Sequence, residues 1–120
     1  MFTKRTVDCP SYIAKDGCRI HELLHPMNEP VDLSYSLAAA TVAPGARTLR
    51  HKLAQSEVYY IRAGCGVMHI GAHSRAVMPG DVIVVPPAAE QWIENPGIGP
   101  LEFLVIVSPP WRAADDTQTE

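Results

Sequence analysis

The feature that most constrains the fold is the regular interruption of short apolar segments by turn-forming residues. Proline, glycine and asparagine recur at 44–45, 64–66, 71, 79–80, 86–87 and 95–97. The segments between them are rich in β-branched residues, and none shows a strong helical period. This spacing predicts an all-β sandwich or barrel. Strands are expected at 19–24, 35–43, 48–53, 57–62, 66–70, 75–78, 82–85, 90–94 and 101–107.

The alanine-rich segment SLAAATV at 36–42 tests this prediction most directly. Its alanines favour a helix by intrinsic propensity. Pro44 and Gly45 follow at once, however, and leave little room for a helix. A strand is therefore expected here as well.

A chain of 120 residues, of which 47% are hydrophobic, has the size of one domain with one core. We expect a single domain over 1–120, with an N-terminal arm and first strand at 1–30, a barrel at 31–110 and an acidic tail at 111–120. The arm is suited to packing on a partner subunit. The tail has almost no apolar side chain after Trp111 and is expected to be mobile.

Charge and cysteine usage exclude several classes of partner. Ten basic and thirteen acidic residues give a net charge of -3, with no basic cluster larger than Lys4 and Arg5. Nucleic acid and anionic membranes are therefore not expected as partners, and no apolar run reaches the ~20 residues that span a membrane. Cys9, Cys18 and Cys65 form an odd set without CxxC spacing or a signal peptide. We expect free thiols in the cytoplasm.

The segment HKLAQSE at 51–57 carries the most informative polar pair, His51 and Glu57. Alternate side chains of a strand share a face, so Leu49, His51 and Leu53 are expected to point inward. A short hairpin would then bring Glu57 near His51, and a buried imidazole and carboxylate need partners. Such a pair can act as a general acid or base.

At these positions the sequence resembles the cupin family. The first cupin motif is G-x5-H-x-H-x3-E-x6-G. All of its spacings are matched here, by Gly45, His51, Leu53, Glu57 and Gly64. The second motif has P x G and then, beyond a strand, P, H and N; its places are taken by Pro79, Gly80, Asp81, Pro86, Gln91 and Asn95. Two spaced motifs in order are a specific signal. The resemblance, detailed over 45–95, implies a double-stranded β-helix, or jelly-roll barrel, over roughly the whole chain.

The resemblance also implies a metal site, but two of its four ligand positions differ here. Metal-binding cupins use both histidines and the glutamate of the first motif and the histidine of the second. Leu53 and Gln91 replace two of these histidines; leucine cannot ligate, and the glutamine oxygen is a weaker, neutral donor. His51, Glu57 and Gln91 form the candidate metal site. The alternative is a metal-free pocket that keeps His51 and Glu57 as a hydrogen-bonded pair.

The other histidines are expected to be structural rather than ligands. His21 and His25 share a face of the first expected strand and its end, and nothing in the sequence places that face near Glu57. Whether either of them replaces a missing ligand stays open. The remaining two, His69 and His73, flank a turn and are expected on the surface of a hairpin.

The resemblance implies a barrel whose mouth binds a small organic molecule. With iron, manganese, nickel or zinc, the implied chemistry is oxygenation, isomerisation or decarboxylation of a small acid or sugar, with His51 and Glu57 as the catalytic residues. The alternative is a non-catalytic, metal-free binding or interaction module. A homodimer is expected because small jelly rolls leave sheet edges and faces to cover. The pocket wall is expected to include Leu53, Tyr59, Ile93 and Phe103.

Overall fold

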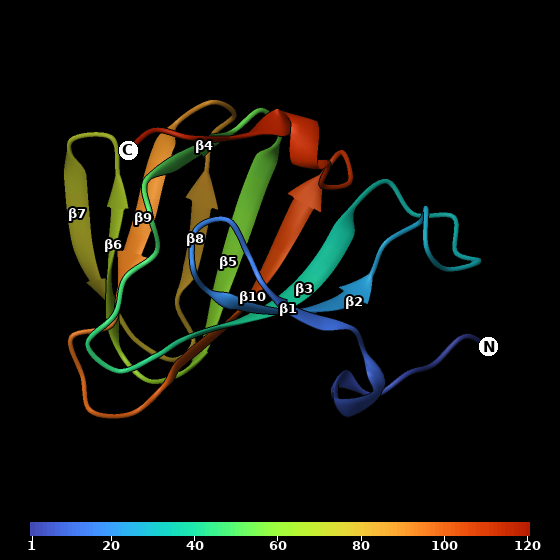
Figure 1. Cartoon of the computed structure of the whole chain (residues 1–120), viewed down its shortest axis with the longest axis horizontal. Helices are drawn as coiled ribbons and strands as arrows, with labels where there is room; N and C mark the ends of the chain where they lie inside the picture. Colours follow the sequence, from blue (N-terminus) through green and yellow to red (C-terminus); the bar gives the residue numbers. More distant parts are fainter.

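The expected strands are present and form two sheets that face each other (Figure 1). The structure is a computed structural model and describes all 120 residues. It contains no α-helix. Its elements are η1 (Thr6–Asp8), β1 (Ser11–Ile13), β2 (Arg19–Leu24), β3 (Ser36–Val42), β4 (His51–Leu53), β5 (Ser56–Ala63), β6 (Gly66–Ile70), β7 (His73–Val77), β8 (Val82–Val85), β9 (Glu90–Glu94), β10 (Leu101–Ser108), η2 (Ala113–Asp115) and β11 (Asp116–Gln118).

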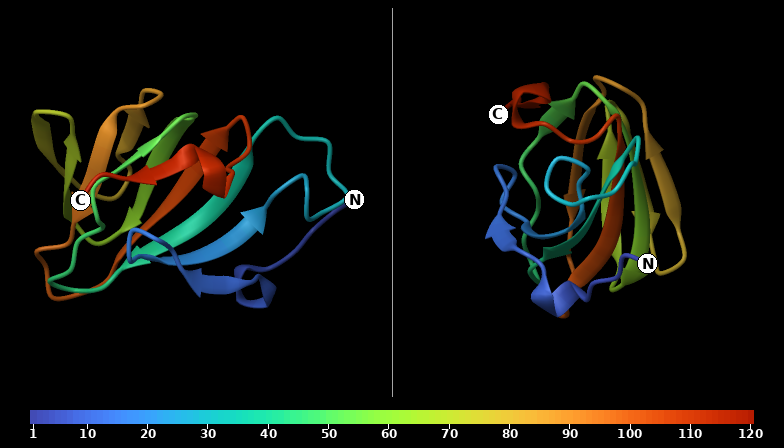
Figure 2. Two further views of the ribbon diagram at one scale, coloured as in Figure 1. Left: turned by 45° about the horizontal axis from the view of Figure 1, so that its top comes forward. Right: turned by 90° about the vertical axis from the view of Figure 1, so that its right-hand side faces the viewer.

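The order of the strands confirms the jelly-roll prediction. The first sheet runs β1, β2, β3, β10, β5, β8, and the second runs β11, β4, β9, β6, β7. All pairings within both sheets are antiparallel. From β4 onward the chain passes repeatedly from one sheet to the other, which winds it around a common interior (Figure 2). Such winding closes the fold into a barrel.

The alanine-rich segment is a strand, as expected. Strand β3 pairs with β10 along its whole length, from Ser36 with Val107 to Val42 with Leu101. Its other side pairs with β2. Ladder hydrogen bonds on both sides outweigh the helix propensity of its alanines, because propensity yields to tertiary context.

The core lies between the sheets and is built from alternate side chains of the facing strands. Ile61 of β5, Ile93 of β9 and Leu101 of β10 are each 0% exposed. The turn between β5 and β6 requires glycine at Gly64, whose φ is +76° and whose position would bring a Cβ against the carbonyl of Pro100. This steric need explains the last glycine of the first motif.

Both ends of the chain form structure that the sequence does not reveal. Strand β1 pairs with β2 of the same chain, so this part of the N-terminal arm forms the edge strand of its own first sheet. The tail at 111–120 was predicted to be mobile, and this prediction is wrong in the structure. It forms η2 and β11, and β11 pairs with β4. A short polar strand that is held by backbone hydrogen bonds lacks the hydrophobic alternation by which strands are predicted from sequence.

No helix of the structure is of a length and hydrophobicity that would cross a membrane.

Candidate functional site

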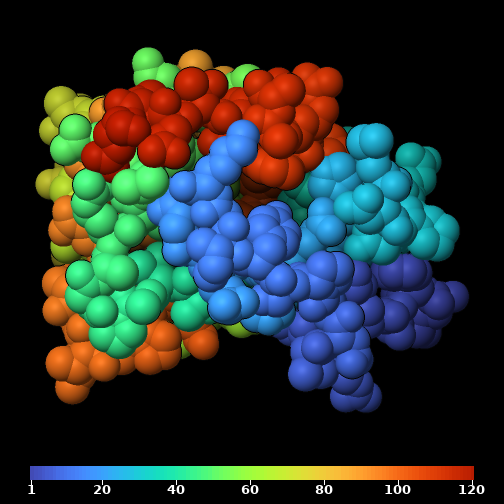
Figure 3. All heavy atoms as spheres, in the orientation of Figure 1, coloured from blue at the N-terminus to red at the C-terminus, as the bar shows by residue number.

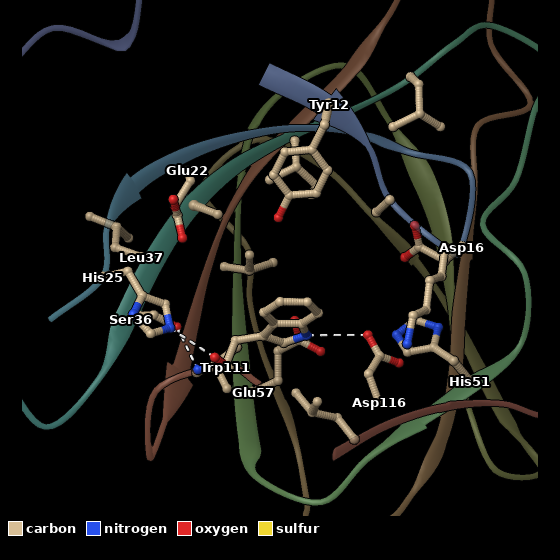
Figure 4. Close-up of a pocket in the computed structure, with 18 residues that line it drawn as sticks. Tyr12, Asp16, Glu22, His25, Ser36, Leu37, His51, Glu57, Trp111 and Asp116 are labelled. Atoms are coloured by element: carbon tan, nitrogen blue, oxygen red, sulfur yellow. Dashed lines mark hydrogen bonds between the residues drawn. The ribbon is translucent and has the colours of Figure 1, made fainter. Parts of the chain in front are cut away.

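A cavity of about 210 Å³ lies where the two ends of the chain close over the first sheet. Figure 3 shows a hollow between the N-terminal residues, in blue, and the C-terminal residues, in red. The polar and charged side chains around the cavity are drawn in Figure 4. Its wall consists of Tyr12, Ile13, Ala14, Lys15, Asp16, Ile20, Glu22, His25, Ser36, Leu37, Ala38, His51, Leu53, Glu57, Val105, Val107, Trp111 and Asp116.

His51 points inward from β4, as expected, and is 7% exposed. Its Nδ1 lies 3.0 Å from the carbonyl oxygen of Leu49. A carbonyl oxygen can only accept, so Nδ1 carries the hydrogen and Nε2 of the neutral ring keeps a free lone pair. His51 therefore offers the cavity a base whose tautomer is set by the backbone.

Glu57 enters the cavity wall from β5 and is 8% exposed. Its Oε1 is buried and has no hydrogen-bond partner. Burial raises the pKa of Glu57 to about 7, against the opposing effects of the nearby His51 and the Gln91 amide. Near neutral pH this carboxyl can therefore both accept and donate a proton.

Gln91 lies beside His51 in the register of β4 and β9 and is 0% exposed. The hydroxyl of Tyr59 donates to its Oε1 at 2.6 Å. Burial, with the nearby Glu57 charge, raises the pKa of Tyr59, so this hydroxyl keeps its hydrogen. The Nε2 group of Gln91 has no partner. Gln91 is not among the residues that line the cavity, so it acts on the site through Glu57, whose pKa its amide lowers.

The donor set does not fit the metal centre that the sequence motif implies. Leu53 places an apolar side chain, 2% exposed, at one ligand position. The Gln91 oxygen is engaged by Tyr59, and its amino group cannot ligate a cation. His51 and Glu57 remain, and no group of three or more His, Cys, Asp or Glu side chains is placed to hold a metal ion. Two protein donors fall short of the three that catalytic centres such as those of zinc use.

The two histidines of the N-terminal region do not replace the missing ligands. His25 lines the cavity, but its Nε2 donates to the carbonyl of Trp111 at 2.8 Å, and its Nδ1 accepts from the Met27 N–H at 3.2 Å. Both ring nitrogens are therefore occupied. His21 sits on β2 outside the cavity wall.

The other two histidines also lie away from the site. His69 stacks on Trp92 with 4.3 Å between ring centroids and contacts Glu94, whereas His73 is exposed on β7. The four histidines other than His51 thus have structural or surface positions.

Three of the four residues expected to line the pocket belong to the core instead. Leu53 does line the cavity. Tyr59, Ile93 and Phe103 are part of the hydrophobic core, and the rings of Tyr59 and Phe103 stack at 5.0 Å. Strand alternation distinguishes inside from outside, but it does not distinguish a packed interior from an open one.

Trp111 is the most important cavity residue that sequence reasoning missed. Its backbone N–H donates to Oγ of Ser36 at 2.9 Å, and its indole N–H donates to Oδ2 of Asp116 at 3.2 Å. His25 binds its carbonyl oxygen. These contacts hold the indole over the cavity (Figure 4). The available signal was a large aromatic residue at the start of an otherwise polar tail.

Comparison with known proteins supports the same architecture. The family model of the cupin domain matches residues 39–107. An uncharacterized protein of Methanocaldococcus jannaschii, MJ1618, is 43% identical over 105 residues, which is 87% of this chain and 83% of that protein.

Solved structures with little sequence identity share the fold. The polyketide cyclase RemF from Streptomyces resistomycificus has a TM-score of 0.82 at 16% identity and covers 100% of this chain and 86% of its own. A variant of Streptomyces PAC13 with uridine has a TM-score of 0.81 at 18% identity, over 100% and 92%. A predicted oxalate decarboxylase from Thermotoga maritima has a TM-score of 0.77 at 24% identity, over 90% and 99%.

Proposed function

The chain belongs to the cupin family, and from this premise we propose that its cavity binds a small organic molecule on which Glu57 and His51 transfer protons. The observation that carries the proposal is the unpartnered Oε1 of Glu57, buried in the cavity wall of a barrel. A buried polar atom without a partner is costly unless a ligand supplies one.

The two groups are suited to complementary steps. As a carboxylate, Glu57 can take a proton from a carbon or hydroxyl of the ligand and become the neutral acid. It can then return that proton to a neighbouring atom, which amounts to an isomerisation. The free Nε2 of His51 can accept a hydrogen bond from a hydroxyl of the same ligand and fix its orientation.

Metal-dependent chemistry receives less support from the side chains at the site. A divalent ion would be held by His51 and Glu57 and would supply Lewis-acid or redox chemistry, but the amino group of Gln91 and the side chain of Leu53 do not fit it. We therefore propose proton transfer that needs no metal.

Exchange with solvent tests the proposal. The protein, treated with EDTA, is incubated in D2O with a panel of small carbonyl, hydroxyl and amino compounds, and deuterium that stays bound to carbon after return to H2O is measured by mass spectrometry. We expect incorporation into at least one compound, and a rate for Glu57→Gln that is lower by about a hundredfold or more.

Two variants control this experiment. Glu90→Gln removes a carboxyl on β9 outside the cavity wall and is expected to leave the rate unchanged. Leu53→His restores a histidine of the motif and serves as a positive control for metal uptake. Incorporation by wild-type protein only after metal loading would contradict a metal-free mechanism.

The alternative function is a non-catalytic binding module that keeps the cavity. It is favoured by the same loss of two ligand positions, Leu53 and Gln91. A compound that binds the wild-type cavity but gains no deuterium, with or without added metal, would establish this alternative.

A cytoplasmic homodimer completes the proposal. The first sheet exposes a group of apolar side chains on its outer face, formed by Tyr60, Val82, Val84 and Ile106. In the register Val58 lies opposite both Val84 and Ile106, so these side chains are neighbours on one face. A second copy of the chain could cover them.

All three cysteines are free thiols, in keeping with a reducing compartment.

A further inference from the structure

The charge of the cavity wall points to the class of ligand. Four carboxyl groups line the cavity: Asp16, Glu22, Glu57 and Asp116. None of them takes part in the four ion pairs of the structure, which join other residues. A concave surface that carries one sign of charge concentrates ligands of the opposite sign.

The one basic side chain of the wall, apart from histidine, does not neutralise these carboxyl groups. The ammonium group of Lys15 donates to the carbonyl oxygen of Ala113 at 3.3 Å. His25 has both ring nitrogens in hydrogen bonds to backbone groups. One ammonium group against four carboxyl groups leaves the wall with an excess of acidic groups.

Three of the carboxyl groups have an oxygen that no protein group engages. Asp16 accepts a backbone N–H with Oδ1, which leaves Oδ2, and Asp116 accepts the indole N–H of Trp111 with Oδ2, which leaves Oδ1. Glu57, 8% exposed, has no partner for Oε1. In Figure 4 the side chains of Asp16 and Asp116 lie on the same side of the cavity as His51. Glu22 differs, since Asn28 donates to both of its oxygens.

The rest of the wall is apolar. Ten of the eighteen lining residues are hydrophobic, and the indole of Trp111 lies among them. A ligand that fits this wall combines a small apolar body with a polar end. Aromatic faces also attract cations, so Trp111 suits a positively charged group as well.

We propose that the cavity selects a small organic cation, a primary or secondary amine with an apolar body. This inference rests on the proposed function, because it assumes that the cavity binds a small molecule. The ammonium group donates to the free oxygens of Asp16, Asp116 and Glu57, while the body packs against Val105, Val107 and Trp111. A carboxylate ligand of the same shape would be repelled, and an alcohol would leave the charges of the wall unbalanced.

Matched ligands test the charge preference directly. Binding of benzylamine, benzyl alcohol and benzoate is measured by ligand-observed NMR and calorimetry, together with the smaller series isobutylamine, isobutanol and isobutyrate. In at least one series the amine is expected to bind about tenfold or more tightly than the alcohol, with no binding of the carboxylate.

Variants locate the effect in the cavity. Asp16→Asn and Asp116→Asn keep shape and hydrogen-bonding capacity and are each expected to weaken amine binding about tenfold, with little effect on the alcohol. Asp32→Asn, at an exposed carboxyl outside the cavity wall, is the matched control and is expected to bind like wild type.

The outcomes separate the two proposals. If an alcohol or a carboxylate binds as tightly as its amine, or if the aspartate variants keep full amine affinity, the amine preference is overturned while a ligand-binding cavity remains. If no member of either series binds, small-molecule binding itself is contradicted, and the inference falls with it.

Discussion

At the scale of single residues, the site is defined by what surrounds Glu57. Position 57 keeps the carboxyl group of the motif. Neither Leu53 nor the amino group of Gln91 can join it in binding a metal cation. Burial therefore dominates and raises the pKa of Glu57 to about 7, from the usual 4.5. A raised pKa means that the folded protein favours the neutral acid.

This shift predicts that stability depends on pH. In the unfolded chain Glu57 loses its proton near pH 4.5, whereas in the folded protein it does so near pH 7. Its contribution to stability is full below pH 4.5 and is lost as the pH rises through 7. The free energy of unfolding is expected to fall across this range by at most about 3 kcal/mol.

Urea unfolding of wild type and Glu57→Gln between pH 4.5 and 8 measures this effect. The neutral variant should lack this component of the slope and become more stable than wild type above pH 7. Glu90→Gln should follow wild type. A constant difference between wild type and Glu57→Gln across the range would show that Glu57 is not the group responsible.

At the scale of elements, the tail turns β4 from an edge strand into an interior one. Strand β11 pairs with β4 on the side away from β9. The carboxylate of Glu120 accepts from the backbone N–H of Arg50 at 2.7 Å and from the guanidinium of Arg47 at 2.7 and 3.0 Å. These hydrogen bonds hold the pKa of Glu120 at about 2, so they persist over the ordinary pH range.

Deleting residues 116–120 is expected to expose β4 and to loosen it. The amide of Arg50 loses its acceptor, so its hydrogen exchange should accelerate about tenfold or more. The amide of Ile61, bonded to the carbonyl of Asp81 at 3.0 Å, is an internal control that should change little. Unchanged exchange at Arg50 would mean that the tail does not protect β4. NMR-detected exchange reports both amides in one experiment.

At the scale of the whole molecule, the two faces of the first sheet have different surroundings. The inner face supplies Glu57, Val105 and Val107 to the cavity. The outer face exposes Val84 at 63% and Ile106 at 38%, next to each other across β5. A clustered apolar surface of this kind is typical of an interface.

The dimer prediction is tested at this face. Light scattering after gel filtration is expected to give twice the chain mass for wild type and the single-chain mass for the double variant Val84→Lys and Ile106→Lys. Two buried ammonium groups per protomer would oppose association. Ile98→Lys, at a fully exposed loop residue, is the control and should remain dimeric. A monomeric wild type would refute the dimer.

The barrel and the inward direction of three site residues follow from local sequence patterns. Turn residues at regular intervals set where strands begin and end, and the period of two placed His51, Leu53 and Glu57 inside. Local chemistry suffices for these features, because side-chain direction in a strand follows from backbone geometry. The spacing of the two motifs confirmed the same architecture independently.

The surroundings of those residues, in contrast, arise from tertiary packing. Asp16 and Trp111 reach the cavity from opposite ends of the chain, and no local sequence pattern predicts that they line the same cavity. Tyr59 of one sheet donates to the Gln91 oxygen of the other and so leaves only the amino end of that amide without a partner. These contacts depend on how distant segments pack. Packing therefore governs whether Glu57 meets a metal, a cationic ligand or no partner at all.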